Sequence, residues 1–277
     1  MTSVQKVIKY IAIAFAIFLT VTIISAILGG FFAVAGVLGL KNAHKKLDNN
    51  KEEIINIASI ESNDIKTLEI DLAYTSLSIK NGEAFKIDTN NSNITYKQDN
   101  NNLKIEDETR KWYFATANNY ELILYIPDNY ELENVKITTG AGEISIDSLN
   151  VNKLEFELGA GKIKIDNLNV ADECNIEGGA GELNILSGTI NDLDLDMGVG
   201  ETNIIASLIG KNQINAGVGS LNIKLQDNKE NYKIKVNKGI GNITVDGKGT
   251  SDGEVFGNGD NKIDIDGGIG NITVDFE

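Results

Sequence analysis

The tripeptide Gly-x-Gly recurs seven times in the second half of this 277-residue chain. Successive copies begin 19, 20, 19, 19, 22 and 29 residues apart, and the last two both read GIGNITVD. A period of this length indicates a repeat architecture, because one short unit cannot bury its apolar face alone. The glycines concerned are Gly140, Gly142, Gly159, Gly161, Gly179, Gly181, Gly198, Gly200, Gly217, Gly219, Gly239, Gly241, Gly268 and Gly270.

Two short strands flank each Gly-x-Gly tripeptide. In one unit Leu154, Phe156 and Leu158 alternate with polar residues, and Ile163 and Ile165 do so further along. Alternation with a period of two is typical of strands that have one buried and one solvated face. Each unit is therefore predicted to hold two strands that share one core.

The alternation slips by one residue at the glycines. Ala160 continues the first apolar series, yet it lies three residues before Ile163 instead of two. Gly161 stands between them, and glycine accepts the backbone angles that a tight bend or bulge requires. We therefore interpret Gly-x-Gly as a corner between strands, and we expect its middle residue, which is always apolar, to point into the core.

Stacking of such units predicts an all-β fold, a β-solenoid with turns of about 19–20 residues. We expect this domain to span residues 65–277, with irregular first turns and a cap in 65–139 and regular repeats in 140–277. In the first of these segments Leu68, Ile70, Leu72 and Tyr74 share one face before a similar slip.

The end of the chain bears on self-association. The final strand, residues 271–277, is expected to leave an unpaired ladder edge, because no capping segment follows it. End-to-end stacking into filaments is therefore an alternative structural role for this chain.

A long apolar segment precedes the predicted solenoid. Residues 11–40 contain no charged side chain, and about 20 such residues suffice to cross a membrane. We expect residues 1–41 to form a cytoplasmic tip and a transmembrane helix, with the lipid bilayer contacted by residues 7–40. Residues 42–64 would form a polar tether to a domain outside the cytoplasm. A signal peptide cleaved near residues 33–35 is the rival interpretation.

Composition limits the partners of the domain. The chain has a net charge of −15, and residues 47–277 contain 20 basic and 40 acidic residues. A domain this acidic repels nucleic acid and anionic lipid. Cys174 is the only cysteine, so no intramolecular disulfide forms, and its place in the repeat predicts a small core residue.

These residues also carry a family resemblance. The stretch YELILYIPDNYELENVKITTGAGEISIDSL, followed by repeats of Gly-[Ala/Val/Ile]-Gly-x-[Ile/Leu], resembles the DUF4097 family over residues 65–277. Members of this family are labelled adhesins or LiaG-like proteins of Gram-positive bacteria. The resemblance implies a membrane-anchored β-solenoid of the cell envelope and carries over no catalytic residue.

Three kinds of chemistry are alternatives to a purely architectural role for the repeats. A phosphate-binding loop would need a Gly-Lys-Ser/Thr end and a following helix, and neither is present. Calcium would need regular oxygen ligands, yet Lys162 interrupts the acidic residues that follow the corners. A carbohydrate-active site would need a carboxylate pair among the side chains of the solvated faces. These are Glu143, Asp147, Glu155, Glu157, Asp166, Glu177, Glu182, Asp192, Asp194, Asp196 and Glu201.

The sequence therefore predicts no catalytic, cofactor or metal site. We expect a non-enzymatic, stress-associated scaffold of the cell envelope, similar to an adhesin, that binds an envelope protein or polymer. The self-stacking filament is the first alternative, and a calcium-binding or carbohydrate-active β-helix is the second.

Overall fold

The computed structural model describes residues 54–60, 64–108, 120–237 and 239–277. The chain divides into two compact units, Met1–Lys51 and Glu52–Glu277, and every described residue lies in the second. The expected tip, membrane span and first part of the tether lie outside the described residues. Among those that are described, no helix combines the length and apolar character needed to cross a bilayer.

The second unit is built from strands, as the alternation predicts. Its strands join into one 16-stranded sheet, and the described residues contain no α-helix. A short 3-10 segment, η3 (Lys229–Asn231), precedes β12, and Asn228 caps it by accepting a hydrogen bond from the Glu230 N–H. The prediction of an all-β fold is confirmed.

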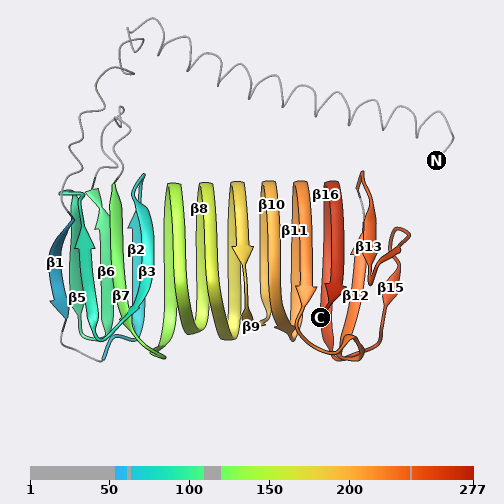
Figure 1. Ribbon diagram of the computed structural model, residues 1–277, viewed down its shortest axis with the longest axis horizontal. Helices are drawn as coiled ribbons and strands as arrows, with labels where there is room; N and C mark the ends of the chain where they lie inside the picture. The colour runs from blue at the N-terminus through green and yellow to red at the C-terminus, as the bar shows by residue number, and fades with distance from the viewer. Residues whose placement is uncertain (1–53, 61–63, 109–119, 238) are drawn as a thin grey trace, which may run out of the picture. The chain divides into compact units, whose positions relative to one another are not determined.

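Regular turns form the middle of the unit (Figure 1). They consist of β8 (Glu131–Ile185), β9 (Gly188–Asn191), β10 (Leu193–Ile209) and β11 (Lys211–Leu225). These strands pair in parallel, with Leu193 opposite Cys174 and Gln213 opposite Asp194, so partners are 19 residues apart. Because the register is parallel, each residue type stacks on its equivalent in the next turn.

The last turns do not follow chain order. The C-terminal strand β16 (Asn261–Phe276) pairs in parallel with β11 on one side. On its other side it pairs with β12 (Tyr232–Asn237) and β13 (Ile243–Val245). The chain therefore passes outward through β12 and β13, and then returns to fill the place next to β11.

The expected free edge at residues 271–277 is therefore wrong. Both edges of β16 are paired, and β12 and β13 lie beyond it. Two short strands of the connecting loop then cover that outer turn in antiparallel pairing: β14 (Lys248–Gly249) on β13 and β15 (Val255–Phe256) on β12. This covering removes the observation on which the filament alternative rested.

The first turns are less regular. β2 (Thr67–Leu72) and β3 (Ser76–Gly82) pair in parallel with β8. On their other sides β6 (Asn102–Asp107) pairs with β2 and β7 (Glu121–Pro127) pairs with β3, both in parallel. Antiparallel strands β4 (Phe85–Thr89) and β5 (Ile94–Asp99) close this end.

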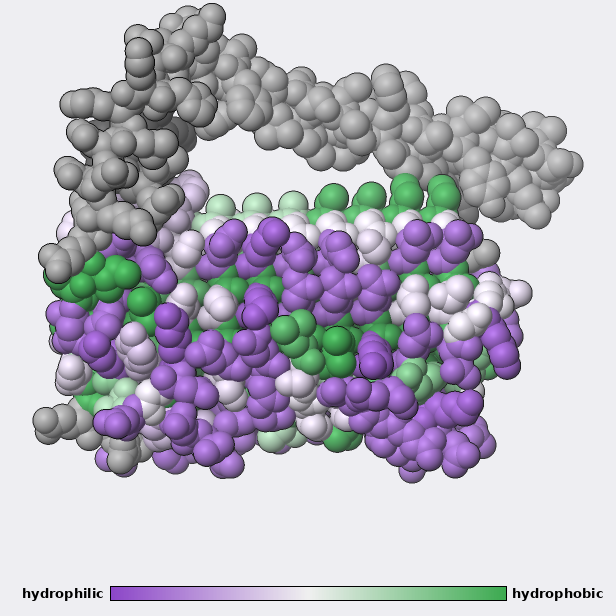
Figure 2. Space-filling view, in the orientation of Figure 1, coloured by the Kyte–Doolittle hydropathy of each residue, from purple (hydrophilic) through white to green (hydrophobic). Residues whose placement is uncertain are grey.

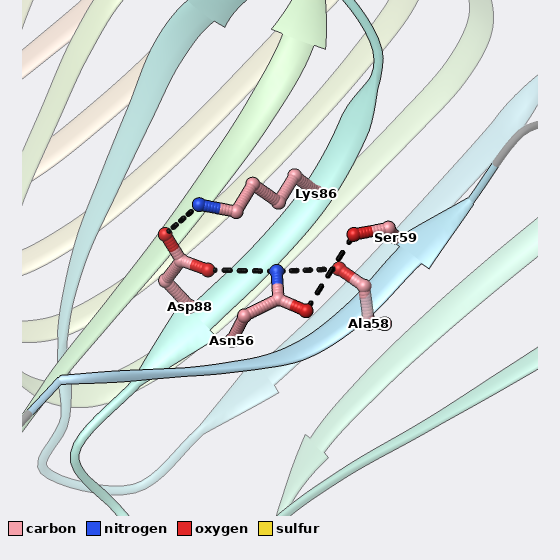
Figure 3. A network of polar contacts seen from close by, with 5 residues as sticks. All are labelled: Asn56, Ala58, Ser59, Lys86 and Asp88. Carbon is pink, nitrogen blue, oxygen red and sulfur yellow. Dashed lines mark hydrogen bonds and ion pairs between the residues drawn. The ribbon is translucent and has the colours of Figure 1, made fainter.

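The outermost strand at this end is β1 (Ile55–Ile60), which pairs antiparallel with β4. The Asn56 amide donates to an Asp88 carboxylate oxygen at 3.0 Å, and Lys86 pairs with the other oxygen at 2.7 Å (Figure 3). Residues 55–60 were assigned to the tether, so the tether as predicted is too long. The domain begins with a strand that polar contacts hold on β4.

The core is a stack of equivalent aliphatic side chains inside the coil. Phe156, Ile176 and Leu195 are each at most 1% exposed and occupy one inward position of successive turns. Cys174 is fully buried in the neighbouring position, which confirms its prediction as a core residue, and desolvation raises the pKa of its thiol. Burial of these side chains is the main stabilising contribution of each turn.

Asn212 interrupts this apolar stack at a position where other turns carry an aliphatic residue. Its carbonyl oxygen accepts from the Leu193 N–H, and its amide donates to the carbonyl oxygens of Ile209 and Lys262 at 3.2 and 3.1 Å. The side chain is 1% exposed. Asn212 therefore connects β10 and β11 to the inserted strand β16, and all its polar atoms have partners.

Candidate functional site: an exposed apolar ridge

The corner of each turn depends on its second glycine. Gly161 has φ of +143°, a region that side-chain-bearing residues rarely adopt. A Cβ atom added there would overlap the carbonyl oxygen of Gly142 in the preceding turn. Backbone angle and close stacking therefore both require glycine, and the corners of successive turns lie directly on one another.

The middle residue of each tripeptide points to solvent, not into the core. Val199, Val218 and Ile240 are 52%, 46% and 62% exposed, Ala160 and Ala180 are exposed as well, and Ala141 and Ile269 are half-buried. The expectation that these residues fill the core is wrong. The strand leaves the interior after Leu158 and returns at Ile163, so both glycines and the residue between them lie on the convex side of the corner.

The middle residues form one continuous row along the coil. Val199 lies opposite Ala180 and Val218, and Ile269 lies opposite Val218 and Ile240. Figure 2 shows the row along the upper edge, with its colour deepening toward the C-terminal turns. We call this row the ridge; in spatial order it comprises Ala141, Ala160, Ala180, Val199, Val218, Ile269 and Ile240.

The ridge increases in height from one end to the other. Three alanines are followed by two valines and two isoleucines, so the side chains lengthen toward the C-terminal end of the coil. Tyr74 occupies the equivalent corner before Ala141, because Leu72 pairs with Thr139 and Leu77 with Ile144. Tyr74 is 57% exposed, so its expected place on the buried face is wrong as well.

A groove of about 880 Å³ runs along one flank of the ridge. Its floor contains the first glycine of five corners, from Gly159 to Gly268. Carboxylates border it on the side away from the ridge, one from each of four turns. These are Glu157, Glu177, Asp196 and Asp266. An apolar row beside a row of negative charge is therefore accessible along several turns.

A second groove of about 650 Å³ lies on the other flank. It contains Glu143, Lys162, Glu182 and Glu201. Lys162 pairs with Glu182 at 3.0 Å, and hydrogen bonds from Asn184 and then Lys162 lower the pKa of Glu182. This groove is therefore less acidic than the first, because one cation neutralises its centre.

The exposed carboxylates of the two faces make contacts along the ladder. Lys136 forms ion pairs with both Glu155 and Glu157. The hydrogen bond that Lys136 donates to Glu157 lowers the pKa of Glu157. Asp196 accepts a hydrogen bond from the amide of Asn215 in the next turn. Within the described ranges no three His, Cys, Asp or Glu side chains are arranged to hold a metal ion. These contacts stabilise stacked turns and do not form an acid–base pair.

Sequence reasoning identified the corner residues but did not recognise the surface they form. The fourteen corner glycines lie where the chain turns, with the second glycine of each tripeptide at φ between +143° and +154°. The informative signal was that the middle residue is aliphatic while its neighbours are glycine, a pattern that also fits an exposed row. The sequence also holds the aromatic residues Trp112, Tyr113 and Phe114 close together, and these three lie outside the described residues.

Fold and surface together define a class of protein: a coil whose turns are made of parallel, stacked β-strands and which carries an exposed aliphatic ridge. The sequence profile of the Toastrack DUF4097 family matches residues 65–256, which is more than half of the chain. The chain therefore belongs to the Toastrack DUF4097 family, and the resemblance noted in the sequence is confirmed.

Solved structures of bacterial proteins show a looser likeness. A "putative cell adhesion protein" from Clostridium sporogenes is 19% identical over 81% of this chain and 100% of that chain, with a TM-score of 0.37. A "putative adhesin" from Bacteroides fragilis is 11% identical over 80% of this chain and 97% of that chain, with a TM-score of 0.41. No curated protein sequence matches the chain.

Proposed function

We propose that this protein is a membrane-anchored, non-enzymatic, adhesin-like module of the cell envelope, with its coil outside the cytoplasm. The observation that carries the proposal is the ridge. Soluble monomers rarely expose a continuous apolar strip along their whole length, and such strips mark interaction sites. A stress-associated scaffold role is compatible with a module whose ridge serves binding.

The anchor in this proposal rests on the sequence. Residues 11–40 are uncharged and long enough to span a bilayer. The chain enters the coil at β1, the outermost strand of one end, so an anchor would hold the coil by that end. The remaining length of the ridge would then be free to contact a partner.

A non-enzymatic role is supported by the chemistry of the coil surface. The described residues include neither histidine nor arginine. Their acidic side chains lie on open, solvated faces apart from Asp88 and Asp107, which are buried and hydrogen-bonded. General acid–base catalysis favours groups whose pKa is shifted by enclosure, and neither groove encloses a carboxylate pair in that way. The proposal therefore assigns binding, and no reaction, to this surface.

Thiol labelling of intact cells tests the topology. A Val199→Cys variant carries one exposed thiol in addition to the buried thiol of Cys174. We expect a membrane-impermeant maleimide to label this variant on intact cells and to leave the wild type unlabelled. Labelling that appears only after lysis would contradict an extracytoplasmic coil.

Adhesion is tested separately with cells that display the full chain. A Val218→Asp change places a charge on the ridge, and Asn152→Asp places one on another exposed face as the matched control. We expect only V218D to reduce attachment or cell clustering. Equal attachment by V218D and wild type, at equal surface amounts, would refute the adhesin-like role of the ridge.

A further inference from the structure

The taper of the ridge identifies a partner. Read in spatial order, the ridge is Ala, Ala, Ala, Val, Val, Ile, Ile. Reversing this row gives a row that is tall where the first is low. We propose that the ridge pairs with the ridge of a second copy of this chain, in antiparallel orientation.

The antiparallel register follows from side-chain size. Ala141 faces Ile240, Ala160 faces Ile269, Ala180 faces Val218, and Val199 lies on the two-fold axis. Each facing pair then has a similar combined height, so the two coils meet evenly along their length. A parallel pair would set alanine on alanine at one end and isoleucine on isoleucine at the other, which holds the coils apart at the alanine end.

Tyr74 favours this register over the one that is shifted by one turn. A shift that placed Tyr74 opposite Ile240 would bring two large side chains together at each end of the pair. In the register centred on Val199, Tyr74 instead extends past the end of the partner's ridge. Contacts of this kind, in which the same patch is used by both copies, are characteristic of two-fold dimers.

The glycines beside the ridge make the approach feasible. Each ridge residue stands between two residues without side chains, so the partner's backbone meets no bulk on either flank. The ridge itself is uncharged over its whole length, so pairing buries no unpaired charge. The acidic residues lie beyond the glycines, at the outer borders of the grooves.

The area sets the strength of pairing. Seven turns at about 4.8 Å give a strip roughly 30 Å long, and the ridge with its flanking glycines, three residues at about 3.3 Å each, is about 10 Å wide. The contact is then roughly 300 Å² per copy, compared with about 800 Å² in a standard stable interface. We therefore expect a weak, reversible dimer, which many anchored copies acting together would strengthen.

The geometry of the pair connects it to the proposed function. The two β1 strands, where each chain enters its coil, lie at opposite ends of an antiparallel pair. Copies held by those ends on two facing surfaces would therefore join the surfaces. This consequence rests on the proposed anchoring and adhesion, whereas the pairing of ridges does not depend on either.

Disulfide cross-linking of the full chain, purified in detergent, tests the pairing. The antiparallel register predicts that Val199→Cys oxidises to a covalent dimer with itself. Ala141→Cys alone and Ile240→Cys alone should stay monomeric, whereas a mixture of the two should form the mixed dimer. Asn152→Cys, exposed on another face, is the matched control and should give about tenfold less dimer than V199C at equal concentration.

Several outcomes would overturn the proposal. Self-linking of A141C and of I240C would establish a parallel pair, and no dimer above the N152C level would exclude ridge pairing. Protection of the V199C thiol from a maleimide in the monomeric full chain would show that another segment of the chain covers the ridge. Retained topology and adhesion without cross-linking would refute pairing alone and leave the proposed function intact.

Salt separates a second copy from a cationic partner. Two acidic coils repel, so raising the salt concentration should increase the yield of V199C dimer by screening that repulsion. Adding a lysine- and leucine-rich peptide tests the other occupant. If such a peptide bound at low salt, competed with cross-linking and were released by salt, the ridge would be assigned to a cationic ligand instead.

Discussion

Replacing one corner glycine should destabilise the whole coil. In Gly161→Ala the new residue must hold φ near +143°, which costs about 1–3 kcal/mol. Its Cβ atom would also overlap the Gly142 carbonyl oxygen, and relieving such crowding costs about another 1–3 kcal/mol. We expect a loss of about 2–6 kcal/mol, a large part of the roughly 5–15 kcal/mol that stabilises a typical domain.

Urea unfolding followed by circular dichroism measures this loss. Gly249→Ala is the matched control, because a Cβ atom there meets nothing within 4 Å and the backbone needs no positive φ. The control should change stability by less than about 0.5 kcal/mol. If G161A and G249A unfolded at the same urea concentration, the corner would not depend on glycine and the reasoning would be refuted.

Two further predictions concern polar contacts of the coil. Asn212→Leu should cost about 2–4 kcal/mol in urea unfolding because it leaves buried backbone groups without partners. Asn222→Leu, which removes a half-buried side-chain hydrogen bond to Asn203, should cost less than about 1 kcal/mol, and equal losses would contradict this role. The hydrogen bond from Lys136 lowers the pKa of Glu157 in the folded state. The Glu157 carboxylate therefore stabilises the fold at pH values above its unfolded pKa, which is near 4.5. This stabilisation is lost as the pH falls through the lower pKa of the folded state. Glu157→Gln should therefore lose at most about 1 kcal/mol at pH 7, and the difference from wild type should vanish in strong acid; a constant difference across pH would contradict the assignment.

The period and the alternation of the sequence were enough to predict the fold. Leu154, Phe156 and Cys174 recur at equivalent points, and equivalent points stack in a parallel ladder. The class of fold therefore follows from local patterns that agree with one another. The same patterns predict Cys174 as part of the core, where it is fully buried.

The direction of the corner residues was not determined by those patterns. Ala160 continues the apolar alternation that begins at Leu154, so extending the period of two placed it inside. The structure ends that period at Leu158, because the chain must go around the outside of the corner before Ile163. An aliphatic residue between glycines fits either side, and only the backbone path decides between them.

The order of the last turns was also beyond the sequence. The two GIGNITVD copies offer the same ladder residues, Ile243 with Val245 and Ile272 with Val274, so the apolar pattern fits either copy next to β11. Asn212 provides a clue in hindsight, since its amide reaches the Lys262 carbonyl across the junction. The carbonyl that the Asn212 amide contacts depends on which strand lies next to β11, and the identity of residue 212 alone does not reveal that strand.

The exposed position of the ridge is the central claim, and thiol labelling of the purified Val199→Cys chain tests it most directly. The native Cys174 is the internal reference, because it is fully buried and the pKa of its thiol is raised. We predict that one thiol per folded chain reacts at once with a maleimide, at residue 199, and that the second reacts only on unfolding. Protection of both thiols in the folded monomer would show that residue 199 is not accessible and would contradict the account.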